Sequence, residues 1–185
     1  MSDISPDFFY PETEQCKPRI AISACLSGEQ VRYDGTDKHL ADGGFLKQYF
    51  ELLPVCPEVG AGMTVPRPAV QLVAREGHVR AIGRDDPSLD VTDALQAYCQ
   101  GSLEHLSQNT ISGYLLKSRS PSCGLNSTPL FDHKGNILDH RSGLQAAYFQ
   151  QHMPWLVFRQ ENQLNKLQCY QQFLWLCQAS SECQR

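Results

Sequence analysis

Short apolar runs alternate with longer amphipathic segments along most of the chain. Continuous apolar runs bounded by polar, Gly or Pro residues are typical of buried strands. Such runs occur at residues 19–26, 54–56, 112–117 and 155–158. Residues 69–83 predict a hairpin that turns at Glu76-Gly77, and residues 130–138 contain a second turn at positions 134–136.

Helical spacing of apolar residues marks the segments between these strands. From Asp90, a suitable N-cap, apolar side chains recur at helical spacing. Residues 45–53, 143–153 and 163–178 fit further helices. Because strands alternate with helices, the pattern predicts a single α/β domain, Rossmann-like, with a mostly parallel central sheet and helices on both faces.

The two ends of the chain lack this pattern. We expect residues 1–18 to form an N-terminal lead-in, residues 19–178 the folded domain and residues 179–185 a C-terminal tail. A chain of 185 residues can bury roughly 70% of its unfolded surface, so it needs no disulfides to hold a core. There is no signal-peptide pattern and no apolar run of the ~20 residues that a membrane helix requires, so a cytoplasmic protein is expected.

Charge and cysteine content narrow the classes of partner and cofactor. The chain has 16 Lys and Arg against 20 Asp and Glu, for a formal net charge of −4. Nucleic-acid-binding domains usually carry a basic patch, so this balance argues against a nucleic-acid polymer as the main partner. In a reducing compartment, the eight cysteines are expected to be buried thiols, metal ligands or catalytic groups rather than disulfides.

Three of the cysteines share a setting at the ends of apolar strands. Cys25, Cys56 and Cys123 occur in ISAC-LSG, LPVC-PEVG and LLKSRSPSC-GL. Loops beyond the carboxyl ends of parallel strands form the ligand crevice of an α/β sheet, so these thiols can converge. Pro57 and Gly124 stand beside two of them, which the packing of a core cysteine does not require. The alternative is that all three are small core residues.

Three converging thiolates would leave one coordination position open. Such a set suits a zinc ion with an open position, or a cubane iron–sulfur cluster ligated at three of its four irons. There is no CxxC pair to indicate a structural zinc site, and the six histidines form no metal-binding pattern. Structural or incidental roles are expected for Cys99, Cys169, Cys177 and Cys183.

Three blocks in order, ISACLSGEQVRYDG, PVCPEVGAGMTVPRPAVQLV and LKSRSPSCGL, resemble the bacterial thiouracil desulfidase (TudS) family over about residues 19–160. The resemblance implies a [4Fe-4S] cluster bound by Cys25, Cys56 and Cys123, whose open iron binds the substrate sulfur. It implies non-redox, hydrolytic C–S cleavage that converts thiouracil or thiouridine monophosphate to uracil or UMP and sulfide. This activity would belong to nucleotide salvage.

The implied chemistry needs a base and groups that manage protons near the cluster. Glu58, two residues past Cys56, is the best-placed base; alternatively it is a first-turn carboxylate beside a helix dipole. Ser120, three residues before Cys123, could orient water or a substrate heteroatom, or only form the turn. For Ser122 we expect a structural role.

Several cations and polar residues beside the motif cysteines could contact a substrate. The candidates are Arg32, Tyr33, Asp34, Arg67, Lys117 and Arg119. Lys117 and Arg119 would suit the phosphate of a nucleotide; the alternative is that both are solvated surface charges. Asp34 precedes a glycine and could do no more than shape that turn, and Arg67, between two prolines, could be a spacer.

Two other functions stay open from the sequence. A zinc-thiolate hydrolase could use the same three cysteines. A thiolated-tRNA-binding relative is the other alternative, because related desulfidases carry a second domain and act on thiolated tRNA. We expect this chain to lack that domain, and its acidic charge favours a small thiolated pyrimidine base or nucleotide.

Overall fold

The computed structural model describes residues 17–41 and 43–182. The expected lead-in at residues 1–18 therefore lies almost wholly outside the described residues, as do Cys183 and the last residues of the expected tail. The first residues of that tail, up to Glu182, continue the last helix of the fold. Within the described part of the chain, no helix has the length and apolar character needed to cross a membrane.

The described elements follow one another in the alternating order that the sequence predicts. In chain order they are β1 (Arg19–Ser23), η1 (Ala24–Leu26), α1 (Gly43–Tyr49), β2 (Glu51–Val55), α2 (Pro57–Gly60), β3 (Val70–Arg75), β4 (His78–Gly83), α3 (Thr92–Gln108), β5 (Gly113–Leu116), β6 (Thr128–Phe131), β7 (Ile137–Arg141), α4 (Leu144–His152), β8 (Val157–Gln160), η2 (Glu161–Gln163) and α5 (Leu167–Glu182).

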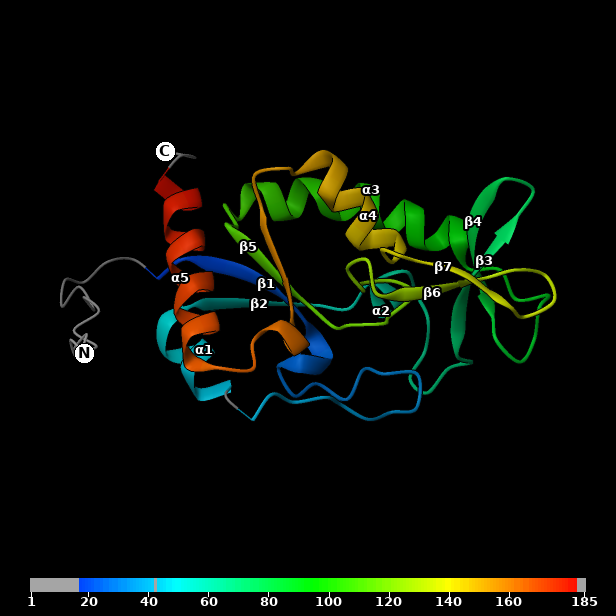
Figure 1. Cartoon of the computed structure of the whole chain (residues 1–185), viewed down its shortest axis with the longest axis horizontal. Helices are drawn as coiled ribbons and strands as arrows, with labels where there is room; N and C mark the ends of the chain where they lie inside the picture. The colour runs from blue at the N-terminus through cyan, green and yellow to red at the C-terminus, as the bar shows by residue number, and fades with distance from the viewer. Residues whose placement is uncertain (1–16, 42, 183–185) are drawn as a thin grey trace, which may run out of the picture.

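The central sheet is parallel throughout and runs in the order β2-β1-β5-β8. Side chains alternate between its two faces, as the pleat of a strand requires. On one face, Ile20 and Ile22 pack against α1 and α5, and on the other Ala21 and Tyr114 pack against α3 and α4 (Figure 1). This arrangement confirms the predicted α/β domain with a mostly parallel sheet and helices on both faces.

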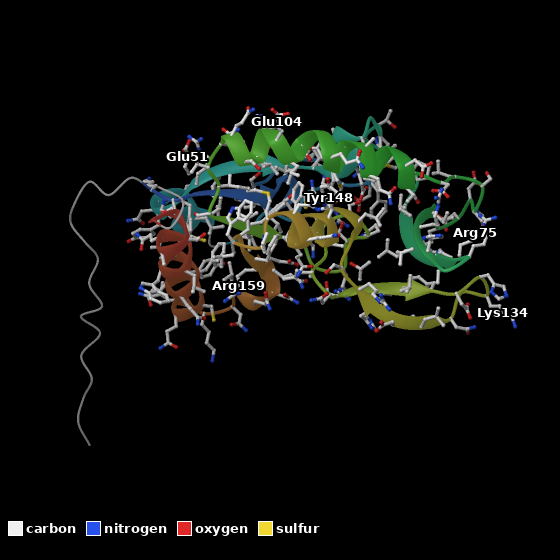
Figure 2. The ribbon with its side chains drawn as sticks, turned by 90° about the horizontal axis from the view of Figure 1, so that it is seen from above. Glu51, Arg75, Glu104, Lys134, Tyr148 and Arg159 are labelled. Atoms are coloured by element: carbon white, nitrogen blue, oxygen red, sulfur yellow. The ribbon has the colours of Figure 1, made fainter. Side chains whose placement is uncertain are left out.

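A second sheet, in the order β4-β3-β6-β7, was not expected. It contains the predicted hairpin, whose turn places Glu76 and Gly77 at positive φ, as a tight two-residue hairpin turn demands. The hairpin joins the β6–β7 pair because β3 and β6 lie parallel. Arg75 and Lys134 mark the tips of these two pairs, at the end of the molecule remote from α5 (Figure 2).

Several element boundaries differ from the sequence prediction: β8 covers Val157–Gln160 rather than residues 155–158, and the N-cap of α3 is Val91 rather than Asp90. The helix expected over residues 45–53 ends at Tyr49, because Glu51–Val55 instead pairs in register with β1. Pro54 lacks an N–H but is tolerated because β2 is an edge strand. The last helix begins at Leu167 rather than at residue 163. Residues 161–163 instead form η2, whose N-terminus has a capping box between Gln160 and Gln163.

Candidate functional site

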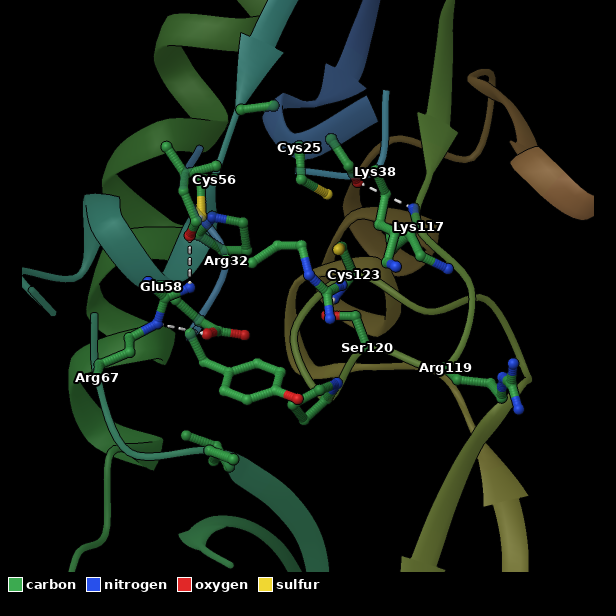
Figure 3. Close-up of a pocket in the computed structure, with 18 of the residues that line it drawn as sticks. Cys25, Arg32, Lys38, Cys56, Glu58, Arg67, Lys117, Arg119, Ser120 and Cys123 are labelled. Atoms are coloured by element: carbon green, nitrogen blue, oxygen red, sulfur yellow. Dashed lines mark hydrogen bonds and ion pairs between the residues drawn. The ribbon is translucent and has the colours of Figure 1, made fainter. Parts of the chain in front are cut away.

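The three motif cysteines lie just beyond the carboxyl ends of three adjacent strands of the central sheet. Cys25 lies in η1 directly after β1, Cys56 is the N-cap residue of α2 after β2, and Cys123 lies in the turn that follows β5. Because β2, β1 and β5 are parallel neighbours, their ends open at the same place. All three cysteines line one cavity of about 330 Å³ (Figure 3).

The environment of the three thiols differs from that of a cysteine nucleophile. Burial, with a smaller contribution from the charge of Cys123, raises the pKa of Cys25 to about 12. Burial also raises the pKa of Cys56 and of Cys123. Nucleophilic cysteines have a lowered pKa instead. These thiols therefore stay protonated near neutral pH, and a metal that bound them would have to displace the protons.

Two serine hydroxyls, those of Ser120 and Ser23, lie within hydrogen-bonding distance of the Cys123 sulfur. The Oγ of Ser120 accepts the backbone N–H groups of Ser122 at 3.3 Å and Cys123 at 3.2 Å, so this hydroxyl shapes the turn. Against the effect of burial, hydrogen bonds from Ser120 and Ser23 lower the pKa of Cys123. Ser23 was not identified from the sequence; the only available signal was a hydroxyl at the end of an otherwise apolar strand.

The turn that carries Cys123 is held tightly on both sides. A Cβ on Gly124 would lie 2.3 Å from Thr128 Oγ1 and 2.9 Å from the carbonyl oxygen of Ser120, so this position requires glycine. On the other side, the first N–H groups of α4 donate to the carbonyl groups of Pro121 and Ser122, each at 2.9 Å. The turn is thus fixed by a helix N-terminus, whose orphan donors it satisfies.

Glu58, in the first turn of α2, faces the cavity with both carboxylate oxygens engaged. Oε2 accepts the Nε–H of Arg67 at 2.7 Å, and Oε1 accepts the hydroxyl of Ser122 at 2.8 Å. The remaining guanidinium nitrogens of Arg67 donate to the carbonyls of Val31 and Thr64. Arg67, a candidate for substrate contact, is therefore bound to Glu58, and Ser122 has a polar role that the sequence did not indicate.

Lys117 also lines the cavity, and its ammonium is paired with Glu161 of η2. The same carboxylate accepts the backbone N–H and the hydroxyl of Ser118, each at 2.6 Å. Burial alone would raise the pKa of Glu161, but the hydrogen bonds from Lys117 and Ser118 lower it overall. Glu161 carried no local sequence signal, because it reaches the site only through the pairing of β5 with β8.

We predict that Glu161→Gln destabilises the metal-free protein by about 2 kcal/mol, because it leaves the half-buried Lys117 ammonium without a counter-charge. The Glu161 pKa is lowered in the folded state, so its stabilisation is present above the ordinary value of 4.5 and is lost as pH falls through the lowered pKa. Urea unfolding of both proteins between pH 7 and pH 3 measures this.

The matched control is Glu51→Gln, which removes an exposed ion pair with Arg19 and should cost less than about 1 kcal/mol. Equal losses in the two variants, or a difference that persists at the lowest pH, would contradict the assigned role of Glu161.

The loop after Cys25 contains three of the residues predicted to contact a substrate, and two of them line the cavity. Arg32 and Tyr33 line the cavity, with the guanidinium carbon 5.4 Å from the centroid of the Tyr33 ring. Asp34 does not line it; its carboxylate accepts the N–H and the hydroxyl of Thr36 at 3.1 and 2.6 Å and shapes the loop. The charge of Arg32 also lowers the pKa of Cys25, against the larger effect of burial.

Lys38 and Arg119 are the cavity cations whose side chains have no ion pair or hydrogen bond within the described residues. Both are anchored through the backbone, the N–H of Lys38 to the Cys25 carbonyl at 2.8 Å and that of Arg119 to Ser127 Oγ at 2.9 Å. Figure 3 shows both beside the cavity. Lys38 was not identified from the sequence, because it lies well beyond Cys25 in a polar loop.

The donor set fits an iron–sulfur cluster. Cluster irons are bound by cysteine thiolates, and three are present here. Within residues 17–41 and 43–182, no other cysteine lines the cavity, and no three His, Cys, Asp or Glu side chains gather closely enough to hold a metal ion. Three thiolates would leave one iron of a cubane cluster without a ligand from these cysteines.

Comparison with known proteins extends over most of the fold. A family model described as 2-thiouracil desulfurase matches residues 20–161. Uncharacterized protein YbbK of Bacillus subtilis (strain 168) is 29% identical, over 71% of this chain and 89% of that protein. A solved structure of the [4Fe-4S]-dependent thiouracil desulfidase TudS has a TM-score of 0.66 and 30% sequence identity, covering 84% of this chain and 99% of that chain.

Proposed function

Since the chain belongs to the 2-thiouracil desulfurase family, we propose that it hydrolyses the C–S bond of a thiolated uracil at a [4Fe-4S] cluster. The observation that carries this proposal is that Cys25, Cys56, Cys123 and the carboxylate of Glu58 line one cavity. The products would be uracil or its nucleotide and sulfide, which would place the reaction in nucleotide salvage. The similarity to TudS, whose solved structure is described as [4Fe-4S]-dependent, supports the choice of cofactor.

Cys25, Cys56 and Cys123 would hold the cluster. When bound, it supplies an iron without a protein ligand, a Lewis acid for the soft thiocarbonyl sulfur. Arg32 and Lys117 lie close enough to Cys25 to lower its pKa, and so place positive charge beside an anionic group. Ser120 would keep its hydroxyl hydrogen directed at the sulfur side, since its oxygen already accepts two backbone N–H groups.

Glu58 would act as the general base. Each of its oxygens holds one hydrogen bond from the protein and retains a lone pair that can accept a proton from water. The water oxygen then bonds to the ring carbon, the C–S bond breaks, and sulfide leaves with the protons that water supplied. Arg67 and Ser122 would fix the direction of the carboxylate, and a fixed direction is what general-base catalysis requires.

The cations of the cavity favour a nucleotide monophosphate over the free base. The charge of Lys117 is already balanced by Glu161, whereas Lys38 and Arg119 carry charges that no described residue balances. Phosphate oxygens are strong partners for both side chains. We propose that Lys38 and Arg119 hold the phosphate and that Tyr33, exposed at the cavity, offers its ring to the pyrimidine.

Arg119→Ala is expected to raise the KM for thiouridine monophosphate roughly tenfold, because one charge-assisted hydrogen bond is lost, and to leave the KM for thiouracil unchanged. Steady-state kinetics with the two substrates measure this difference. Arg75→Ala, at the tip of a hairpin of the second sheet, is the matched control. An equal effect of Arg119→Ala on the KM of both substrates would show that Arg119 does not bind the phosphate.

The proposed function is tested by reconstituting the protein anaerobically with iron and sulfide and then adding 2- and 4-thiolated uracils, as bases and as monophosphates. Loss of the thiocarbonyl absorbance, with one sulfide released per substrate consumed, is the expected result. A loaded cluster without turnover of any of these substrates would show that the substrate class is wrong.

A further inference from the structure

A buried polar pair lies behind the Cys123 turn and has no part in the chemistry described above. The hydroxyl of Tyr114 donates to Oε1 of Gln145 at 2.7 Å, and both side chains are completely buried. Among the described residues, Nε2 of Gln145 is the one buried side-chain nitrogen or oxygen atom with no hydrogen-bond partner. Such an orphan is destabilising, and native proteins rarely keep one without a reason.

The pair lies close to a proposed cluster ligand. The backbone N–H of Gln145 donates to the carbonyl of Ser122, the residue before Cys123, at 2.9 Å. Tyr114 and Cys123 belong to one buried cluster, together with Ala146, which follows Gln145 on α4. Apart from burial, the charge of Cys123 is the largest influence that raises the pKa of Tyr114. The pair therefore lies beside the Cys123 turn and not in a remote part of the core.

A protonated thiol is a weak hydrogen-bond acceptor, whereas a thiolate or a cluster sulfide is an anionic one. We infer that Gln145 is a positioning residue whose Nε2–H donates to a sulfur of the cluster site, at the Cys123 thiolate or the sulfide beside it. Tyr114 fixes the direction of the amide by occupying Oε1. This inference rests on the proposed function, because the acceptor forms only when the cluster binds.

Hydrogen bonds to cluster sulfurs set two measurable properties. They stabilise the more negative, reduced state, so they raise the reduction potential. They also hold the ligand in place, and loss of such an outer contact typically weakens metal binding 10- to 100-fold. If Gln145 only satisfied Tyr114 within the core, its replacement would change neither the reduction potential nor the binding of the cluster.

The test compares the wild type with the double variant Tyr114→Phe/Gln145→Met, which replaces both polar partners by apolar groups of similar shape. The metal-free double variant should be as stable as the wild type or more stable, since no polar atom of the pair is left unpaired. Its reconstituted cluster should lose iron to a chelator roughly tenfold faster. The ratio of reduced to oxidised cluster at a given potential should fall about tenfold, which is 59 mV for one electron.

Phe149→Leu is the matched control, because Phe149 is fully buried on the same helix but carries no polar atom. It should lower the stability of the metal-free protein and leave the reduction potential unchanged. If the double variant does not fold, Tyr114→Phe alone serves, since it frees the amide to rotate and should shift both cluster properties in the same direction.

A double variant, or a folded Tyr114→Phe variant, whose potential and rate of iron loss match the wild type would overturn the inference. In that case Gln145 would be a packing residue, and the proposed function would be untouched. A wild-type protein that takes up no cluster under reconstitution would instead contradict the proposed function and remove the inference with it.

Discussion

Replacing Cys123 by Ala is expected to remove both the iron–sulfur cluster and the desulfidase activity. The thiol lies in a turn that Gly124 and the N-terminus of α4 hold in place, and Cys25 and Cys56 are the other described cysteines that line the cavity. Turnover should fall by more than about 100-fold, the upper end of what loss of an outer contact costs, because here a ligand itself is lost. Iron and sulfide per chain, visible absorbance and sulfide release measure the effect.

Cys169→Ala is the matched control, because this free cysteine is half-buried on α5 and does not line the cavity. It should keep the cluster and full activity, whereas Cys25→Ala and Cys56→Ala should behave like Cys123→Ala. Circular dichroism of each variant separates loss of a ligand from loss of the fold. A folded Cys123→Ala protein with a wild-type iron content would exclude Cys123 from the ligand set.

Glu58→Gln is expected to lower kcat roughly 10²- to 10⁴-fold, the range that a positioned general base contributes. The amide keeps the shape of the side chain and can still accept one hydrogen bond from Arg67 or Ser122, but it cannot take a proton from water. The cluster should therefore remain. Single-turnover measurements on the reconstituted variant, with its iron content determined in parallel, separate the chemical step from loading.

Glu51→Gln again provides the control for a lost carboxylate, since Glu51 is exposed and does not line the cavity. Ser122→Ala should lower kcat by a smaller factor, about tenfold, because it loosens the direction of Glu58 without removing the base. A wild-type kcat in Glu58→Gln would show that another group accepts the proton. Loss of the cluster in this variant would assign Glu58 a structural role instead.

The parts of the fold that the sequence predicts are those that depend on local signals. The local sequence alone predicts the strand β1 and the turn at Glu76-Gly77, and both occur where expected. The parallel contact of β3 with β6 depends on which strands meet after the chain has folded, and no local pattern encodes it. The end of α1 at Tyr49 was likewise decided by the pairing of β2 with β1, which overrides helical propensity.

The candidate site divides in the same way. Cys25, Cys56 and Cys123 could be predicted to meet because each stands at the end of a strand, and parallel strands end together. The partners of the charged residues could not be predicted. Glu58 with Arg67 requires the folded loop after α2, and Lys117 with Glu161 requires two neighbouring strands. Spacing along the chain does not show which charges neutralise one another.

The most direct test of a cluster-dependent desulfidase is sulfide release from one thiolated uracil by three preparations of the same protein. They are the metal-free protein, the protein reconstituted anaerobically with iron and sulfide, and the protein loaded with zinc. We predict that only the iron–sulfur form releases sulfide, in proportion to the iron bound per chain. Sulfide release by the zinc-loaded protein, or none by a fully loaded iron–sulfur protein, would contradict the proposal.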